Sequence, residues 1–200
     1  MGYPLGISGN TMNSTFSTKK QFTSQQIIDF WFVETDKAQW WKKDDNFDAL
    51  IQSKFSDIHR KAAQCDLFSW RNSGPGMLAE IIILDQFSRN MYRDEPESFA
   101  CDAIALSLAQ SAIAGGKHFE LDKEKRAFMY MPFMHSESLL IHEEAVKFFT
   151  ELGVESTLNF EYKHKAIIER FGRYPHRNAI LGRVSTPEEE EFLTQPGSIF

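Results

Sequence analysis

Apolar side chains at helical spacing, without the alternation of a strand, are the feature that most restricts how this chain folds. After Asp44 and Asp45, either of which can cap a helix, six apolar side chains recur at offsets of 0, 3, 4, 8, 11 and 15. These offsets place all six on one face of a helix. They are Phe47, Leu50, Ile51, Phe55, Ile58 and Ala62. No segment shows strand-like alternation, and the 18 Phe and 7 Met suit packing between helices. The sequence therefore predicts an all-α fold.

A central helix is predicted around residues 77–84, which are apolar almost all round. The run continues into residues 85–90 without a turn signal, so we expect one helix of about 13 to 16 residues rather than a buried strand. Other boundaries follow from capping side chains and from Gly and Pro. Helices are predicted to begin at Ser24, Pro96, Asp122, Ser136 or Ser138, about Thr157, and Ser185 or Thr186, to be interrupted at Pro132, and to end at Gly115, Gly153 and Gly172.

The chain divides at about residue 21. Residues 1–21 are rich in Gly, Ser, Thr and Asn and are predicted to be a flexible leader, so that residues 22–200 form a single helical domain. The leader lacks the apolar core of a signal peptide, and no stretch has the roughly 18 to 20 apolar residues that would span a bilayer. We therefore expect a cytoplasmic protein without a membrane partner.

Charge and cysteine usage narrow the function classes. The net charge of −6 argues against a general nucleic-acid binder, whose affinity depends on a basic face. Cys65 and Cys101 lie far apart and form no CxxC pair, so free thiols are expected rather than a disulfide framework.

The first polar segment that packing does not require is 84–90. Asp85 and Arg89 are four residues apart with the acid first, which is the favourable order for an ion pair within a helix. One interpretation is a substrate-facing carboxylate beside an Arg that binds an anion. The other is a salt bridge that orients a helix end, with Asn90 as its cap.

The second segment is 130–137, in which His135, Ser136 and Glu137 are consecutive. Sequence neighbours do not face each other on a helix, and there is no GxSxG elbow, so a Ser-based triad is not indicated. Ser136 is expected to cap a helix with Glu137 in its first turn. His135 is the better candidate for a general acid or base or for a ligand-binding group.

The third segment, 163–183, carries six Lys and Arg against one acid, Glu169. Gly172 ends one helix and Pro175 can open the next, so free backbone N–H groups would lie beside the cations. Such a site suits a phosphate or a carboxylate. Internal neutralisation of the acidic chain is the alternative. The candidate ligand-binding side chains of this segment are Arg170, Arg173, His176, Arg177 and Asn178.

Metal binding is not indicated. His135 and His142 are seven residues apart, so on one helix they would be separated by about 10.5 Å, too far to share an ion. There is no HExxH motif and no Cys/His cluster. We expect neither a metal nor a cofactor, although a site assembled from His135, His164 and His176 stays open.

The polar segments 84–90, 131–137 and 170–178, with the helix start at 185–189, together resemble the signature blocks of an uncharacterised bacterial family. That family is a domain of unknown function in the tetratricopeptide-like helical superfamily. The likeness runs from about Phe22 to Phe200 with the blocks in the same order. It implies an α–α superhelix of antiparallel helix pairs, and it implies no activity. The tetratricopeptide pattern of about 34 residues is not visible here.

Three functional hypotheses follow. The first is a helical scaffold whose Arg/His-rich pocket, built from Arg89, Asn90, His135 and the third segment, binds a small anionic ligand or an acidic peptide. The second is a hydrolase or transferase acting on a phosphorylated or carboxylated small molecule, with His135 or His176 moving a proton, Asp85 orienting it and the arginines holding the substrate. The third is a purely structural role for the polar segments. The sequence does not fix an oligomeric state.

Overall fold

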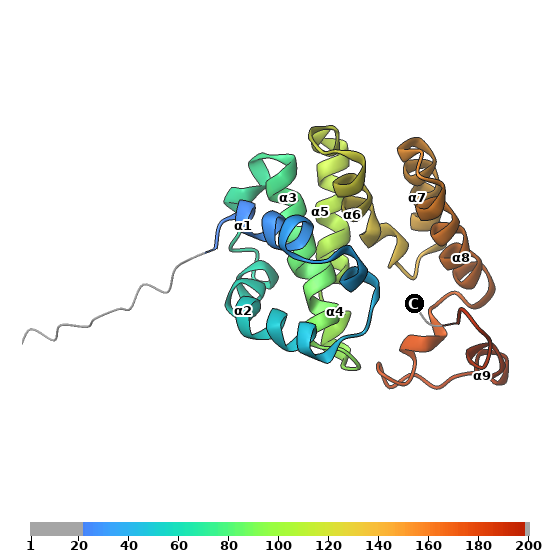
Figure 1. Cartoon of the computed structure of the whole chain (residues 1–200). Coiled ribbons are helices and arrows are strands. Elements are labelled where there is room, and N and C mark those ends of the chain that lie inside the picture. The colour runs from blue at the N-terminus through green and yellow to red at the C-terminus, as the bar shows by residue number, and fades with distance from the viewer. Residues whose placement is uncertain (1–21, 199–200) are drawn as a thin grey trace, which may run out of the picture.

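The computed structural model describes residues 22–198, and every regular element within that range is helical (Figure 1). The predicted leader, residues 1–21, lies outside the described residues. The all-α prediction is confirmed for the described part. The α-helices are α1 (Ser24–Asp29), α2 (Asp45–Ala63), α3 (Gly74–Ile82), α4 (Ser88–Met91), α5 (Asp102–Ala114), α6 (Lys123–Met134), α7 (Leu139–Leu152), α8 (Glu155–Phe171) and α9 (Pro187–Leu193). Shorter turns are η1 (Phe30–Glu34), η2 (Lys37–Trp41), η3 (Phe68–Asn72), η4 (Ile83–Phe87), η5 (Pro96–Ser98), η6 (Lys117–Glu120) and η7 (Pro175–Arg177).

Helix α2 forms as its apolar spacing predicts. Asp44 caps it, accepting hydrogen bonds from Asn46 N at 3.1 Å and Phe47 N at 3.2 Å. The predicted apolar face is buried except at Leu50, which is 47% exposed. Leu50 lies at the edge of the stripe, where the neighbouring helices no longer cover it.

The central helix is longer than predicted because α3, η4 and α4 run without a break from Gly74 to Met91. Ser73 caps its start by accepting a hydrogen bond from Gly76 N. The middle part, η4, is a wide π turn, a rare form that is frequent at functional sites. This helix passes through the centre of the larger bundle (Figure 1).

Several predicted boundaries are confirmed and others are wrong. Asp122 caps α6 and Thr186 caps α9 in a capping box with Glu189, while α5, α7 and α8 end at the predicted glycines. The cap of α1 is Thr23 rather than Ser24. Pro96 opens only the short turn η5, and α5 begins later, at Asp102.

The predicted break at Pro132 is also wrong. Pro132 lies inside α6, which continues to Met134 because the helix is buried on several sides and packing compensates for the missing N–H donor. The predicted restart is confirmed, since Ser138 is the N-cap residue of α7, although its side chain makes no capping hydrogen bond.

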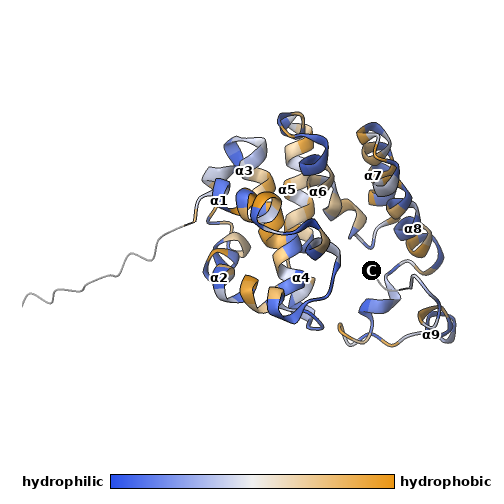
Figure 2. Cartoon of the chain, in the orientation of Figure 1, coloured by the Kyte–Doolittle hydropathy of each residue, from blue (hydrophilic) through white to orange (hydrophobic). Residues whose placement is uncertain are grey.

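The described helices form one large core and one small one. The large core joins α1 to α7, and the hydropathy colouring concentrates its apolar residues on the inward sides of these helices (Figure 2). The small core consists of Ile167, Ile168 and Tyr174, with Phe171 and Phe192 against it. Helices α7 and α8 pack as a pair beside the bundle, and the segment with α9 lies below them (Figure 1). Among residues 22–198 no helix is long and apolar enough to cross a membrane.

Candidate functional site

Asp85, on the π turn η4, is the buried centre of the polar network. Its Oδ1 lies 2.7 Å from Nδ1 of His135 and 2.9 Å from Nη1 of Arg89. Its Oδ2 accepts a hydrogen bond of 2.5 Å from Nε2 of Gln86. Burial alone would raise the pKa of this carboxyl, but the charge of Arg89 and the contact with His135 outweigh burial and hold the pKa well below its usual range. Asp85 is therefore ionised at neutral pH.

His135 closes the C-terminal end of α6, and its two ring nitrogens have different surroundings. Nδ1 faces a carboxylate, so it carries the proton of the neutral ring and donates it to Asp85. No residue in the described range hydrogen bonds to Nε2. Burial and the charge of Arg89 lower the pKa of His135 below 6.5, so the ring is neutral at pH 7 with a lone pair on Nε2.

Two arginines share a second carboxylate, Asp102, at the start of α5. Nη1 of Arg89 lies 3.0 Å from one oxygen of Asp102, and Nη2 donates to the other at 3.1 Å. Nη1 of Arg177 donates to the same carboxylate at 3.2 Å, and Nη2 of Arg177 donates to the carbonyl of His135 at 3.0 Å. Asp85 and Asp102 thus balance the charges of the two arginines.

The guanidinium of Arg177 makes cation–π contacts with two rings, 4.5 Å from the centroid of Phe99 and 4.7 Å from that of Tyr174. Only 6% of Arg177 is exposed, and its Nε has no hydrogen-bond partner among residues 22–198. Burial and the nearby charge of Arg89 lower its pKa. A buried donor without an acceptor is unusual in a native protein.

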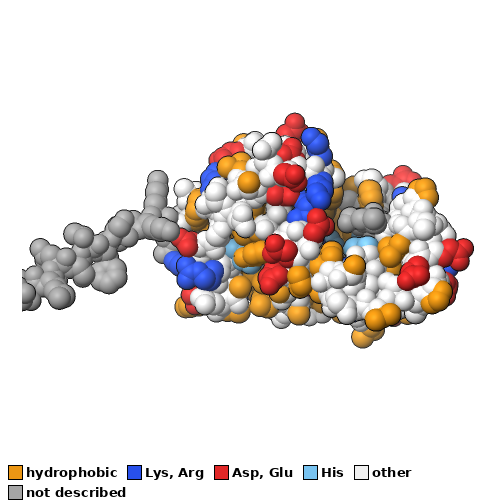
Figure 3. Space-filling model, turned by 90° about the horizontal axis from the view of Figure 1, so that it is seen from below, with side chains coloured by type: hydrophobic (Ala, Val, Ile, Leu, Met, Phe, Trp, Pro, Cys, Tyr) orange, Lys and Arg blue, Asp and Glu red, His pale blue; other side chains and the backbone are white. Residues whose placement is uncertain are grey.

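A cleft of about 390 Å³ opens beside these groups. Asp102, His135 and Arg177 contribute polar or charged side chains to its wall, and most of the other lining residues are apolar. The lining residues are Pro96, Phe99, Ala100, Asp102, Ala103, Leu106, Pro132, His135, Ser136, Glu137, Arg177 and Leu181. On the face drawn in Figure 3, acidic and basic side chains are interspersed rather than gathered into separate patches.

The remaining arginines of the third segment do not reach this cleft. Arg173 binds both oxygens of Glu189 at 2.6 and 2.7 Å, and Arg170 pairs with Glu188 at 2.8 Å. Asn178 donates to the same Glu189 at 3.3 Å. These contacts join the end of α8 and the following loop to α9.

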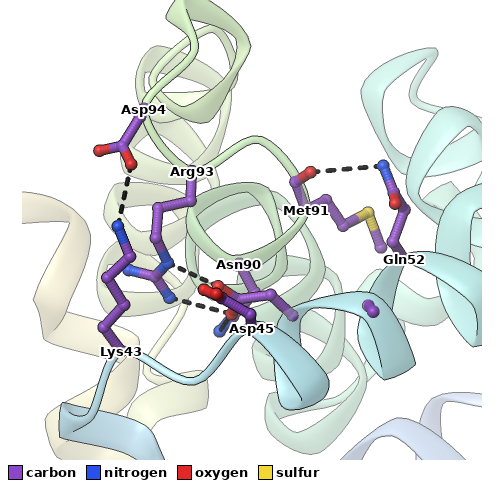
Figure 4. A pocket seen from close by; sticks show the side chains of 9 residues that line it. Lys43, Asp45, Gln52, Asn90, Met91, Arg93 and Asp94 are labelled. Carbon is purple, nitrogen blue, oxygen red and sulfur yellow. Dashed lines mark hydrogen bonds and ion pairs between the residues drawn. The ribbon is translucent and has the colours of Figure 1, made fainter.

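Asn90 also points elsewhere. It donates to Oδ1 of Asp48 at 2.7 Å, and the same carboxylate is bound by Arg93 at 2.6 and 2.9 Å. These residues line a second, open pocket of about 280 Å³ between α2 and the end of α4 (Figure 4). The dashed lines in Figure 4 show that its Arg is already paired.

A buried polar layer underlies the cleft. Nδ1 of His142 lies 2.7 Å from Oε1 of Glu161, and Nε2 of His142 lies 2.8 Å from the carbonyl of Ser136. Because a carbonyl only accepts, Nε2 carries a proton, so the pair shares one further proton between His142 and Glu161. The hydroxyl of Tyr174 donates to the carbonyl of Met134 at 2.5 Å.

Glu137 has a different role from the predicted first helical turn. It binds both Nη atoms of Arg183 at 2.6 and 2.9 Å and accepts a hydrogen bond from Tyr174 N at 2.7 Å. It therefore fastens the loop after α8 to the start of α7. His176 is half-buried against Tyr174, with ring centroids 5.5 Å apart, and does not line the cleft.

Of the predicted site residues, the fold brings together Asp85, Arg89, His135 and Arg177, and it places Arg170, Arg173, His176, Asn178 and Asn90 outside the cleft. Sequence reasoning missed Asp102, Phe99 and Glu137. Asp102 carried only a weak signal, an acid in the first turn of a helix. Within the described residues, no group of three or more His, Cys, Asp or Glu side chains could hold a metal ion.

Comparison with known proteins places this chain in a family. The model of a family described as bacterial protein of unknown function, DUF924, matches residues 27–197. The chain belongs to this family. A solved structure, that of the protein of unknown function ATU0120 from Agrobacterium tumefaciens, is similar, with 36% identity and a TM-score of 0.81. The similarity covers 85% of this chain and 96% of the other. No curated protein matches the chain.

These comparisons support the family resemblance and the all-helical fold. Both descriptions leave the function of DUF924 proteins unknown. A function for this member therefore has to be argued from the geometry of its cleft.

Proposed function

We propose that the cleft binds a small organic anion, a monocarboxylate attached to an apolar body. The proposal rests on the buried guanidinium of Arg177, whose Nε has no hydrogen-bond partner within residues 22–198. Nε2 of its neighbour His135 also has no hydrogen-bond partner within residues 22–198, because the contact with Asp85 is made by Nδ1. Buried donors are normally paired, so a ligand oxygen at Arg177 would complete the hydrogen bonding of the site.

A single negative charge suits this site better than a phosphate with two. Arg177 and the neighbouring Arg89 are already opposed by Asp85 and Asp102. Each further negative charge meets the repulsion of both carboxylates in a partly buried environment, where Coulomb energies are larger than in water. A monocarboxylate carries one negative charge and is therefore repelled less than a phosphate with two.

The rest of the cleft favours an apolar body. Phe99, Leu106 and Pro132 belong to its wall, and Leu181 closes it from the loop after η7. A few polar groups at one end of a mostly apolar pocket are typical of small-molecule sites, where the polar groups fix orientation and the apolar wall supplies affinity.

A calorimetric titration with phenylacetate and its neutral analogue phenylacetamide tests the proposal. We expect phenylacetate to bind more tightly, and Arg177→Gln to weaken its binding by about tenfold or more, the loss of a charged hydrogen bond. Arg170→Gln is the control, since Arg170 pairs with Glu188 away from the cleft. Equal affinities for acid and amide would contradict the proposal.

A second pair of variants avoids removing a buried charge. Ala103 is an exposed residue of α5 that lines the cleft, and Ser107, also exposed, lies one turn further along and does not. Ala103→Trp should fill the cleft and abolish phenylacetate binding, while Ser107→Trp should leave it unchanged. Binding that survives Ala103→Trp places the ligand elsewhere.

The hydrogen bond between His135 and Asp85 favours a second candidate function, general acid–base catalysis. A carboxylate that orients a neutral imidazole leaves Nε2 as a base. In ester hydrolysis, the oxygen of a water would bond to the acyl carbon as Nε2 takes its proton. The ester C–O bond would then break, and that proton would pass to the leaving oxygen. Aryl esters of small acids, assayed with wild type and His135→Gln, test this function; activity that persists in the variant contradicts it.

We also infer that the tetratricopeptide-like superhelix implied by the resemblance describes the helix pairing. Helices α7 and α8 are joined only by Gly153 and Val154, and so short a connection suits an antiparallel pair. Superposition of α5–α6 on α7–α8 in a crystal structure would test it, since a superhelix requires the two pairs to be related by a repeated rotation.

A further inference from the structure

The hydrogen bond from Nδ1 of His135 to Asp85 restricts what Nε2 of the same ring can bind. Nδ1 donates its proton to Asp85, so in the neutral ring Nε2 has only a lone pair to offer. A carboxylate ligand also offers only lone pairs. The two cannot form a hydrogen bond unless a proton is placed between them.

The contacts of Arg177 leave a bound carboxylate in need of a second donor, and His135 is next to the guanidinium. Nη1 and Nη2 of Arg177 already bind Asp102 and the carbonyl of His135, which leaves Nε as its unpaired donor. A carboxylate has two oxygens that need donors when buried. The hydrogen bond from Arg177 Nη2 to the His135 carbonyl places residue 135 next to the guanidinium, and both line the cleft.

We infer that a carboxylate enters the cleft together with one proton, which His135 takes up on Nε2, so that the imidazolium bridges Asp85 and the ligand. This inference rests on the proposed function. Since binding consumes a proton, affinity must rise as the pH falls. The balance of charge supports this coupling, because the added anion is matched by the added proton in a network that is neutral without a ligand.

The charged and titratable groups around His135 act in both directions. Asp85 and Asp102 favour the imidazolium, whereas Arg89 and burial disfavour it in the free protein. His164 on α8 is a further positive group when protonated, but burial lowers its pKa to about 3, so it is neutral over the range of the experiment. A bound carboxylate adds a second negative partner and shifts the balance toward the imidazolium. The remaining charged neighbours are Arg177 on η7 and Glu137, which pairs with Arg183.

Calorimetry of phenylacetate binding in two buffers of different ionisation enthalpy, at about pH 7, measures the protons taken up. We expect wild type to take up about one proton per phenylacetate. Between about pH 6 and 8 its affinity should decrease as the pH rises, with a slope that approaches about tenfold per pH unit. The variant His135→Gln should bind phenylacetate without proton uptake. His118→Gln, on the distant turn η6, is the control and should behave as wild type.

The outcomes separate the inference from the function beneath it. Tight phenylacetate binding without proton uptake overturns the inference and leaves the carboxylate site standing. Uptake that persists in His135→Gln assigns the proton to another group and also overturns it. If phenylacetate does not bind to wild type at any pH in this range, the proposed function fails, and the inference fails with it.

Discussion

The carboxylate of Asp85 and the imidazole of His135, 50 residues apart in the chain, meet with Oδ1 and Nδ1 at 2.7 Å. The contact links the π turn of the central helix to the end of α6. Because Asp85 is fully buried and its pKa is lowered, the contact is made by an ionised carboxylate and leaves Nε2 as the ring nitrogen of His135 without a partner in residues 22–198.

Asp85→Asn should lower the free energy of unfolding at pH 7 by about 3 kcal/mol. Breaking a buried ion pair costs about 3 to 5 kcal/mol, and the lower end applies because Arg89 keeps its partner Asp102. Urea unfolding measures the change. The folded-state pKa is depressed, so this stabilisation is present above the unfolded pKa near 3.8 and is lost as the pH falls below it. Glu144→Gln, which removes a surface pair with Lys147, should change little.

Glu189 should contribute to acid sensitivity. Its hydrogen bonds with Arg173 lower its pKa from 4.5 to about 2. The resulting stabilisation is present above pH 4.5 and is lost as the pH falls toward 2. Glu189→Gln should therefore melt at a lower temperature than wild type at pH 7, and the gap should narrow between these two pH values. Thermal melts across the range measure it; a constant gap would contradict the assignment.

Replacement of Glu161 tests whether the buried Nδ1 of His142 requires a hydrogen-bond partner at this position. Nδ1 of His142 lies against the Glu161 side chain, so the amide of Glu161→Gln can supply a donor to it, whereas Glu161→Met cannot. We expect Glu161→Met to be less stable than Glu161→Gln by about 1 to 3 kcal/mol, the cost of an unsatisfied buried polar group. Denaturant unfolding of both variants at pH 7 measures the difference. Equal stabilities would show that the proton comes from elsewhere.

The stability of wild type relative to Glu161→Gln should also decrease as the pH rises. Burial raises its pKa, so its contribution is fully present below the unfolded pKa and is lost as the pH rises through the folded pKa. The stability of Glu161→Gln relative to wild type should therefore increase above about pH 4.5. Unfolding curves of the two proteins over that range provide the test.

Replacing either of two glycines near helix ends with Ala should cost stability, by different amounts and for different reasons. A Cβ at Gly76 would lie 2.0 Å from the carbonyl oxygen of Trp70, whereas a Cβ at Gly116 would meet nothing within 4 Å. Gly116 has a φ of 69°, so Gly116→Ala costs only the left-handed conformation, about 1 to 2 kcal/mol. Gly76→Ala forces η3 away from α3 and should destabilise more. Melting temperatures of the two variants rank these effects.

The helices could be predicted because their signals are local. The spacing in α2, the caps at Asp44, Asp122 and Thr186, and the glycine ends at 115, 153 and 172 depend on residues within one or two turns. The continuation of α6 through Pro132 and the π turn at 83–87 could not be predicted, since tertiary packing overrides local helix propensity at both places. The start of α5 was missed because Pro96 is as favourable in a short turn as in a helix.

The site was only partly predictable for the same reason. Asp85, Arg89, His135 and Arg177 stood out by residue type, and the fold brings them to one network. Composition could not tell which arginines of the third segment line the cleft, because α9 supplies the partners of those that do not. Glu188 and Glu189, which seemed only to begin a helix, neutralise Arg170 and Arg173. Asp102 gave no pattern that would have connected it to Arg89.

The small core around Tyr174 bears on how a ligand gains entry. The wall that carries Arg177 and Leu181 belongs to the loop after α8, which is anchored to α7 by Glu137 through charged and backbone hydrogen bonds. Solvent-accessible ion pairs weaken with added salt, whereas the apolar contacts of the large core do not. Backbone amides of residues 172–186 should therefore exchange with deuterium faster than those of α3, and added salt should increase the difference. Opening of this loop would then give a ligand its route into the cleft.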